Sequence, residues 1–351
     1  MKAYRPKASN ASLSIRYALM SLCLSAVCHS VIFCHLSKKI SYDRMSMLII
    51  LFNVISVGAM SILSIFADRV NNKHTGVRLS VFITVLGYFL PPSFGIDLKI
   101  VLLGLGSALF YSFASSSVLS RSSGKSRGIG LLIGGQSMGL ACASYAGFFA
   151  HLLAPLLMIL AVPSDKYQSD DTEEEKTANR SAFSLLPLLF VGLSYLLLSF
   201  EFSSFRFDWN LSFKTQFQLL FVIGLGRAVG GFLSDRIGRI ITVAASVSSG
   251  TVLICFCADD KRLSLLGLFL LSMSLAPMLT SVARLFPKMP AFSFALMSGA
   301  SYLGQVFKHF AALNVILMLL ISAMIIAVTV AAELPFMQKT QESEVTVNED
   351  N

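Results

Sequence analysis

Apolar residues along this chain gather into long runs that are separated by short polar segments. A helix needs about 20 mostly apolar residues to cross a membrane. We predict twelve spans, at 15–36, 46–66, 78–96, 99–120, 128–148, 150–163, 182–201, 215–233, 240–258, 263–285, 290–310 and 312–333. The sixth run is the shortest, so we expect that helix to be truncated or strongly tilted. A count of eleven spans stays open.

Composition agrees with this pattern. The chain has 351 residues, of which 55% are hydrophobic and only 13% are charged, and its mean hydropathy is +0.72. Soluble domains carry roughly 25% charged residues. The sequence therefore predicts an all-α integral membrane protein and excludes a soluble enzyme, a nucleic-acid-binding module and a disordered chain. The six cysteines lie within apolar runs without metal-ligand spacing, so we expect no metal and no cofactor.

The distribution of basic residues predicts how the spans are oriented. The net charge is +9, and most of the 28 Lys and Arg residues flank every second loop if the N-terminus lies inside. Cytoplasmic loops carry such an excess of basic residues. We therefore expect a multi-pass protein of the plasma (inner) membrane with both termini in the cytoplasm.

Polar segments divide the chain into two halves of similar size. The segment 164–181 is rich in acidic residues and reads as a solvated linker. The predicted domains are an N-terminal tail at 1–14, a first six-helix bundle at 15–163, the linker at 164–181, a second six-helix bundle at 182–333 and a C-terminal tail at 334–351. We expect the polar end of that tail, 338–351, to be disordered.

A short motif recurs in the two halves, at the ends of the second and eighth predicted spans. Residues 230–239 read GGFLSDRIGR and residues 64–73 read SIFADRVNNK, so Asp235 and Asp68 occupy matching places. The shift that superposes these motifs also carries the fifth span onto the eleventh. Such repetition is typical of transporters built from two similar halves.

The second copy of the motif suits a tight turn at a membrane edge. Gly231 lets a neighbouring helix approach closely, and Gly238 permits the positive φ of a tight turn. Asp235 is an anion that a basic neighbour or the N-terminus of a partner helix can hold. Taken alone, the motif would also fit a plain turn between two helices.

The motif resembles the signature loop of the major facilitator superfamily, which lies between helices two and three and, more weakly, between helices eight and nine. Here the first copy is the weaker one, since Ser64, Asn71 and Asn72 replace two glycines and an arginine. Its strength as a latch is therefore open. The resemblance implies two six-helix bundles and a charge relay that holds a cytoplasmic gate closed. The predicted gating residues are Asp68, Arg69, Gly231, Asp235, Arg236, Gly238 and Arg239.

Residues 104–147 are similar to helices four and five of fosmidomycin-resistance efflux proteins. The matching positions are Gly104, Gly106, Ala108, Phe110, Gly135 and Gly139. Tyr111 begins the triplet that replaces that group's His-Pro-Glu, and His29 stands where its first-helix histidine does. The resemblance implies efflux, by an antiporter type of mechanism, without coupling through that group's carboxylates.

Small residues recur every four positions in the fifth predicted span, and a proline lies within the tenth. Such a stripe lets helix backbones pack closely, and proline kinks a helix. We predict packing or hinge roles for Gly135, Gly139, Gly147 and Pro277. A flexible gating helix is the alternative interpretation of the glycine stripe.

Arg227 is the clearest ionisable residue within a predicted span, about 12 Å along the helix from Asp235. The segment GR-x-x-GG-x-x-SDRIGR resembles helix eight of oxalate and monocarboxylate transporters, in which a similarly placed arginine binds a carboxylate. A structural pairing, or snorkelling of the side chain toward the cytoplasm, would also explain it. The predicted cavity residues are Arg227, His29, Asn53, Tyr111, Gln136 and Gln305.

No predicted span contains a clear buried carboxylate, which leaves facilitated diffusion, anion exchange and coupling through His29 open. We expect a monomeric secondary transporter, not an enzyme, that moves a small molecule across the lipid bilayer by alternating access, with protons as a possible partner and no nucleic acid. Efflux of a drug-like or amphipathic compound is the first hypothesis. Uptake or exchange of an organic anion at Arg227 is the second, and a non-transporting scaffold or sensor is the third.

Overall fold

The computed structural model describes residues 10–32, 41–122, 124–145, 150–161, 192–200, 213–307 and 315–349. Each of the twelve predicted spans contains a helix in this part of the chain, and a 3-10 turn at Pro92–Phe94 precedes the fourth. Gly147 and the predicted linker 164–181 lie outside the described residues.

The first half contains six labelled helices. Their bounds are α1 Asn10–Ser30, α2 Tyr42–Arg69, α3 Lys73–Phe89, α4 Ile96–Arg121, α5 Arg127–Tyr145 and α6 Ala150–Ala161. The sixth has only 12 residues and contains Pro155, in keeping with the short run in the sequence.

The second half begins with helical residues 192–200. The labelled helices that follow are α8 Phe213–Ile237, α9 Arg239–Phe256, α10 Lys261–Met273, α11 Leu275–Leu285, α12 Pro290–Phe307 and α13 Val315–Glu349. By length and apolar composition, seven helices of the described part could cross a membrane, and α10 and α11 together form one of them.

The break between α10 and α11 falls at Ser274, three residues before Pro277. Proline has no N–H to donate, and its ring would clash with the carbonyl group four residues earlier. That carbonyl belongs to Met273, and Gly230 of α8 packs directly against its oxygen atom. The kink predicted from Pro277 therefore lies where α8 approaches the broken helix.

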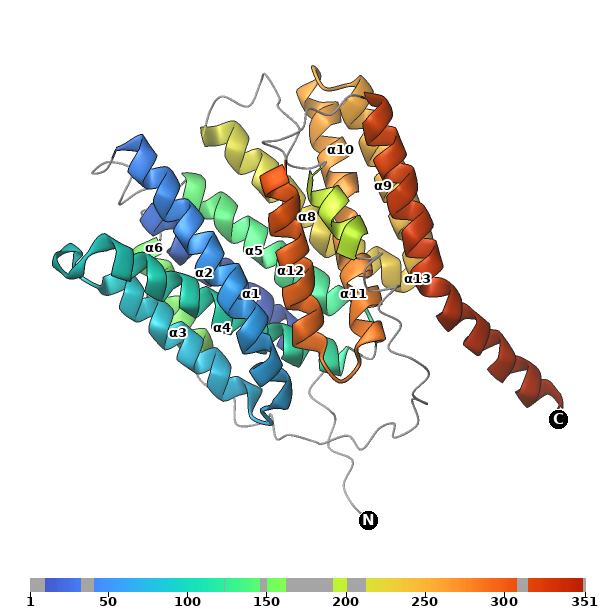
Figure 1. Ribbon diagram of the computed structural model, residues 1–351, viewed down its shortest axis with the longest axis horizontal. Coiled ribbons are helices and arrows are strands. Elements are labelled where there is room, and N and C mark those ends of the chain that lie inside the picture. The colour runs from blue at the N-terminus through green and yellow to red at the C-terminus, as the bar shows by residue number, and fades with distance from the viewer. Residues whose placement is uncertain are drawn as a thin grey trace, which may run out of the picture.

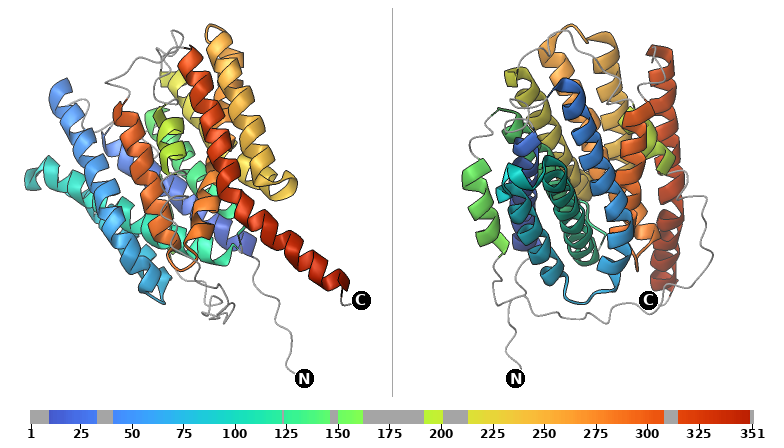
Figure 2. Two further views of the ribbon diagram at one scale, coloured as in Figure 1. Left: turned by 45° about the vertical axis from the view of Figure 1, so that its right-hand side comes forward. Right: turned by 60° about the vertical axis from the view of Figure 1, so that its left-hand side comes forward.

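The two halves lie side by side, with α1–α6 on one side of Figure 1 and α8–α13 on the other. We call the lower edge of that view the terminal face. At this face α1, α3, α5, α9 and α12 begin, and α2, α4, α6, α8 and α11 end. Figure 2 shows the helices running between this face and the opposite one in both views.

Glycines bring α5 and α8 together across the two halves. A Cβ atom placed on Gly134 would lie 2.8 Å from the carbonyl oxygen of Gly224, and one on Gly231 would lie 2.7 Å from that of Ser126. Backbones approach this closely only where side chains are absent. Among the described helices, α5 and α8 form the most extensive contact, so this glycine seam joins the halves.

The other face of α5 packs against α1 within the first half. Added Cβ atoms on Gly135 and Gly139 would overlap the carbonyl oxygens of Ala18 and Leu22. The predicted stripe is thus a packing surface toward α1. The glycines that face the second half belong to a second stripe, displaced by one residue.

The C-terminal tail differs from the prediction. α13 continues without a break to Glu349, whereas residues 338–351 were expected to be disordered. Figure 1 shows this extension projecting from the bundle at the terminal face. Residues 336–349 contain no Gly or Pro. A helix that packing has already nucleated can continue through such a segment, because each added residue gains one hydrogen bond.

We expect Gly134→Ala to lower the stability of the protein by roughly 1–3 kcal/mol, because the added methyl group overpacks the seam. The measurement is thermal unfolding in detergent. Gly58→Ala on α2 is the matched control, since a Cβ there meets nothing within 4 Å. Equal melting temperatures for the two variants would contradict a close contact between α5 and α8.

Candidate functional site

A central cavity of about 410 Å³ lies between the two halves. Both halves line it, through α1, α2, α4 and α5 on one side and through residues 192–200, α8, α11 and α12 on the other. Sites for small molecules have volumes of roughly 300–1,000 Å³. The cavity therefore has the size and place of a substrate site in a two-half transporter.

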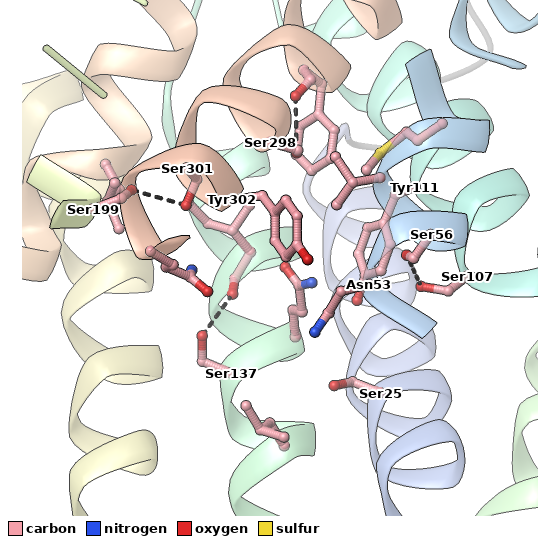
Figure 3. A pocket seen from close by; sticks show the side chains of 18 of the residues that line it. Ser25, Asn53, Ser56, Ser107, Tyr111, Ser137, Ser199, Ser298, Ser301 and Tyr302 are labelled. Atoms are coloured by element: carbon pink, nitrogen blue, oxygen red, sulfur yellow. Dashed lines mark hydrogen bonds between the residues drawn. The ribbon is translucent and has the colours of Figure 1, made fainter. Parts of the chain in front are cut away.

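All six predicted cavity residues line this one space. They are His29, Asn53, Tyr111, Gln136, Arg227 and Gln305. Figure 3 shows Asn53 of α2 and Tyr302 of α12 directed toward each other across the cavity. The structure thus brings together side chains that are almost 300 positions apart in the chain.

Arg227 provides the permanent positive charge of the cavity wall. Its Nη1 donates a hydrogen bond to Ser137 Oγ on α5, at 2.6 Å. Its Nε is buried and has no hydrogen-bond partner in the described part of the chain. Among the described lining residues there is no Asp or Glu that would neutralise the guanidinium group. Arg227 therefore presents unused donors beside an open space.

The rest of the lining combines apolar side chains with uncharged polar groups, chiefly serine hydroxyl groups. Ser56 donates to Ser107 at 3.2 Å within the first half, and Ser199 donates to Ser301 at 2.8 Å within the second (Figure 3). Hydroxyl groups both donate and accept hydrogen bonds. This wall suits a polar ligand more than a purely apolar one.

His29 and Tyr111 are held by neighbours within the first half. Nδ1 of His29 lies 2.8 Å from the Ser25 carbonyl oxygen, which accepts its hydrogen. The Tyr111 hydroxyl lies 3.0 Å from Ser21 Oγ, and Ser21 in turn donates to the Leu132 carbonyl. Both side chains are thereby fixed in orientation at the cavity wall.

Tyr111 also meets the second half. Its ring stacks on that of Phe294 of α12, with centroids 6.1 Å apart and an interplanar angle of 13°. Phe294 is in the first turns of α12, so it lies on the side of the cavity toward the terminal face. The stacked pair forms part of the cavity floor on that side.

The position of the lining residues along their helices shows which way the cavity is displaced. On α1, which begins at the terminal face with Asn10, the lining starts only at Ser25. On α8, which ends there with Ile237, the last lining residue is Arg227. The cavity thus lies in the middle of the bundle and toward the face opposite to the terminal one.

Asp68 closes the terminal face by holding the start of α12. Its two carboxylate oxygens accept hydrogen bonds from the backbone N–H groups of Ala291 and Phe292, at 2.9 and 3.0 Å. Ser116 of α4 donates a third, at 2.8 Å. The first N–H groups of a helix have no partner within the helix and carry a partial positive charge. Asp68 caps them from the opposite half.

Asp235 makes the matching contact in the other direction. It lies near the end of α8 and accepts hydrogen bonds from the N–H groups of Ser126 and Arg127 at the start of α5, at 2.6 and 3.1 Å. Each half thus caps one helix of the other half. The contact at Asp68 exists although the sequence motif around it is incomplete.

A buried ionic cluster stands beside the second contact. Arg239 and Arg284 donate to the carboxylate of Glu333, at 3.2 and 3.1 Å, and Ser281 donates to it as well. Arg239 also donates to the carbonyl oxygen of Gly124 in the first half. The cluster therefore joins α9, α11 and α13 to the turn between α4 and α5.

Glu333 corrects the expectation that no span contains a buried carboxylate. Only 5% of Glu333 is exposed, and it is the last residue of the twelfth predicted span. Burial of this carboxylate is tolerated because two guanidinium groups pair with it. Its partners come from distant helices, so the sequence contained no local signal for the cluster.

The remaining predicted gating residues differ in what they do. Gly238 has a φ of +94°, as a turn directly between α8 and α9 requires. Gly231 is part of the glycine seam. Arg69 and Arg236 are exposed and make no ion pair within the described residues. The ion pairs described at this face therefore involve Arg239 and Arg284 rather than the arginines directly beside the two aspartates.

Two titratable residues at the start of α3 report a positive potential at the terminal face. Burial lowers the pKa of Lys73, with Asp68 opposing and Arg121 adding to the effect. Burial also lowers the pKa of His74, and the nearby arginines, Arg121 before Arg16 and Arg78, lower it further. The positive charge of Arg121 therefore lowers the pKa of both residues at this face.

Comparison with known proteins identifies the fold. A scan of protein-family models and a search of curated proteins both find no match. Among solved structures, the chain is similar to the major facilitator superfamily transporter FucP in the outward conformation, with a TM-score of 0.66 and 15% identity over 92% of this chain and 98% of FucP. It is also similar to the human organic anion transporter MFSD10 (TETRAN), with a TM-score of 0.61 and 14% identity over 93% and 100%.

The fold and the cavity together define a class. The described part of the chain is all-helical, and the chain has the fold of the major facilitator superfamily of membrane proteins, as the motifs predicted. The contacts at Asp68 and Asp235 connect the two halves at one face, and the cavity lies toward the other.

We expect Asp68→Asn and Asp235→Asn each to weaken closure of the terminal face by about 1–2 kcal/mol, which corresponds to a roughly 5- to 30-fold change in the open population. The measurement is the distance distribution between spin labels at Val70 and Lys288, which lie on different halves. Asp259→Asn at the opposite face is the control. Unchanged distributions in both variants would show that these carboxylates do not hold the halves together.

Proposed function

We propose that this protein is a secondary transporter that carries a small organic anion across the membrane by alternating access. The observation that carries the proposal is the pairing of Arg227 with a polar cavity that has no described carboxylate in its lining. The terminal face would be the cytoplasmic face of the plasma membrane, so that the described conformation is open outward. The basic residues at that face support this orientation.

The electrostatics of the cavity favour an anion. A buried guanidinium group without a counter-charge is unfavourable, and an anionic ligand in hydrogen-bond contact with it offsets that cost. Ser137 already orients the group from α5, while Nε has no partner among the described residues. A carboxylate that binds Arg227 would therefore connect α8 with polar groups of the first half.

Efflux of an amphipathic compound is the alternative function, because apolar side chains such as Leu140, Ile223 and Leu279 share the lining with hydroxyl, amide and phenol groups. The positive charge of Arg227, which has no described carboxylate beside it in the lining, favours an anion over a neutral compound of this kind. The human structure to which the chain is similar is described as an organic anion transporter, which supports the anion reading. The direction of transport depends on the transmembrane concentration gradients and not on the structure of the site.

A flux experiment tests the role of Arg227. In proteoliposomes supplied with a panel of labelled mono- and dicarboxylates, we expect Arg227→Gln to weaken binding of the transported anion at least about 30-fold, since an unpaired ligand charge is left in the cavity. Arg227→Lys should keep part of the affinity because the positive charge remains. The rest should be lost because an ammonium group lacks the planar, paired donors of a guanidinium group.

Arg262→Gln, which removes an exposed cation at the opposite face, is the matched control and should transport like the unaltered protein. Equal anion flux in Arg227→Gln would contradict the anion site. Failure of the unaltered protein to move any member of a broad panel, anions and neutral compounds included, would contradict transport itself and favour a scaffold.

We also propose that His29 couples transport to protons, because its imidazole can bind and release a proton and it lies in the cavity wall. An imposed pH gradient should accelerate anion uptake, and His29→Gln should abolish that acceleration while retaining exchange. His151→Gln on α6, outside the cavity lining, is the control. Acceleration that persists in His29→Gln, or that is absent from the unaltered protein, would remove His29 from the mechanism.

A further inference from the structure

A second, smaller cavity lies at the terminal face between α1, α4 and α5. Its volume is about 70 Å³, and it shares no lining residue with the central cavity. This is far below the volume of sites for drug-sized ligands. The space suits a single compact chemical group.

The wall of this cavity is strongly basic. Arg121 is the last residue of α4, Lys125 follows in the turn, and Arg127 is the first residue of α5. The described lining contains no Asp or Glu, and its other polar side chains are the hydroxyl groups of Ser14 and Ser122. Neither Lys125 nor Arg127 makes an ion pair within the described part of the chain.

The surroundings add to the positive potential. The charges of Arg16, Arg78 and Arg121 act on His74, which lies close by at the start of α3. Asp68 and Asp235 are not among the lining residues, and their carboxylates accept hydrogen bonds from backbone N–H groups rather than from the cations of the cavity.

Orientation in the membrane explains why cations are at this face but not why three of them surround a hollow. Basic side chains that only set the orientation of the spans can extend into water, where the repulsion between their charges is weak and screened by salt. Here the ends of α4 and α5 fix the positions from which Arg121, Lys125 and Arg127 extend. An anion with several acceptor oxygens, placed among them, offsets their repulsion and receives charge-assisted hydrogen bonds.

We propose that this cavity binds a phosphate group, carried either by an acidic phospholipid or by a soluble phosphate. The dianionic form of a monoester matches a wall of three cations and two hydroxyl groups better than a monoanionic carboxylate does. The site shares no lining residue with the proposed substrate site at Arg227, so each proposal can be tested without the other.

Binding here would act on the closed gate through the turn between α4 and α5. Arg239 donates to the carbonyl oxygen of Gly124 in that turn, and Asp235 accepts from the N–H groups of Ser126 and Arg127. The second half therefore holds the turn from one side, while Lys125 and Arg127 face the cavity. A bound phosphate group orders the same turn and stabilises the conformation in which the terminal face is closed.

The test is a binding titration on the full-length protein. Melting temperature in detergent is measured against sodium phosphate, with sodium chloride at equal ionic strength as the reference, and in nanodiscs of phosphatidylcholine with and without phosphatidic acid. The variant is Lys125→Gln with Arg127→Gln, which leaves the backbone N–H groups for Asp235. The control is Arg69→Gln with Lys288→Gln, which removes the same charge from exposed positions of the same face.

We expect phosphate, phosphatidic acid or both to raise the melting temperature of the unaltered and control proteins, with the shift absent, or the dissociation constant increased about tenfold or more, in the cavity variant. A response to the lipid alone identifies a headgroup, and a response to inorganic phosphate alone identifies a soluble ligand. An equal shift in the cavity variant, or no shift with either probe in the unaltered protein, would overturn the proposal.

Discussion

The unsatisfied N–H groups at the start of a helix are the constraint on which the arrangement of this protein depends. α5 and α12 both begin at the terminal face, and each would leave its first amides exposed there. Asp235 and Asp68 satisfy these amides from the opposite half. Because the partners come from different halves, the contacts can be made only while the halves are close at that face. A local requirement of helix geometry thus links the two halves at that face.

The rest of the structure follows from this closure. Glycines at the contact between α5 and α8 let the halves approach, and Arg239 adds a further link to the turn before α5 while Glu333 holds its guanidinium group in place. With one end closed, the space between the halves is left in the middle and toward the other end. Arg227 stands at the wall of that space, and no Asp or Glu accompanies it among the described lining residues.

Much of this could be predicted from the sequence because it depends on local signals. The apolar runs predicted the helices, and the repeated Asp-Arg motif predicted the fold. Arg227 was identified because it is a charged residue within an apolar run. The six predicted cavity residues come together because polar side chains within spans avoid lipid and face the interior. The glycine positions that join the halves could not be separated from those that pack α5 on α1, because both stripes run along one helix.

Other features depend on pairs that no pattern in the sequence connects. The burial of Glu333 requires Arg239 and Arg284 from two other helices, and the capping by Asp68 requires the start of α12, more than 200 positions away. The incomplete first motif suggested a weak latch, yet the geometry needs only the carboxylate and a helix start. Serines such as Ser137 and Ser199 are too common in these spans to be recognised as cavity residues without the fold.

If the contacts at Asp68 and Asp235 close the terminal face, the cavity can be reached only from the opposite face, and thiol labelling tests this accessibility. A single cysteine is introduced as Ser301→Cys in a chain whose native cysteines have been replaced, and a membrane-impermeant thiol reagent is added to either side of oriented vesicles. We expect rapid labelling from the side opposite to the terminal face and protection from the terminal side. Rapid labelling from the terminal side, with protection from the other, would contradict it.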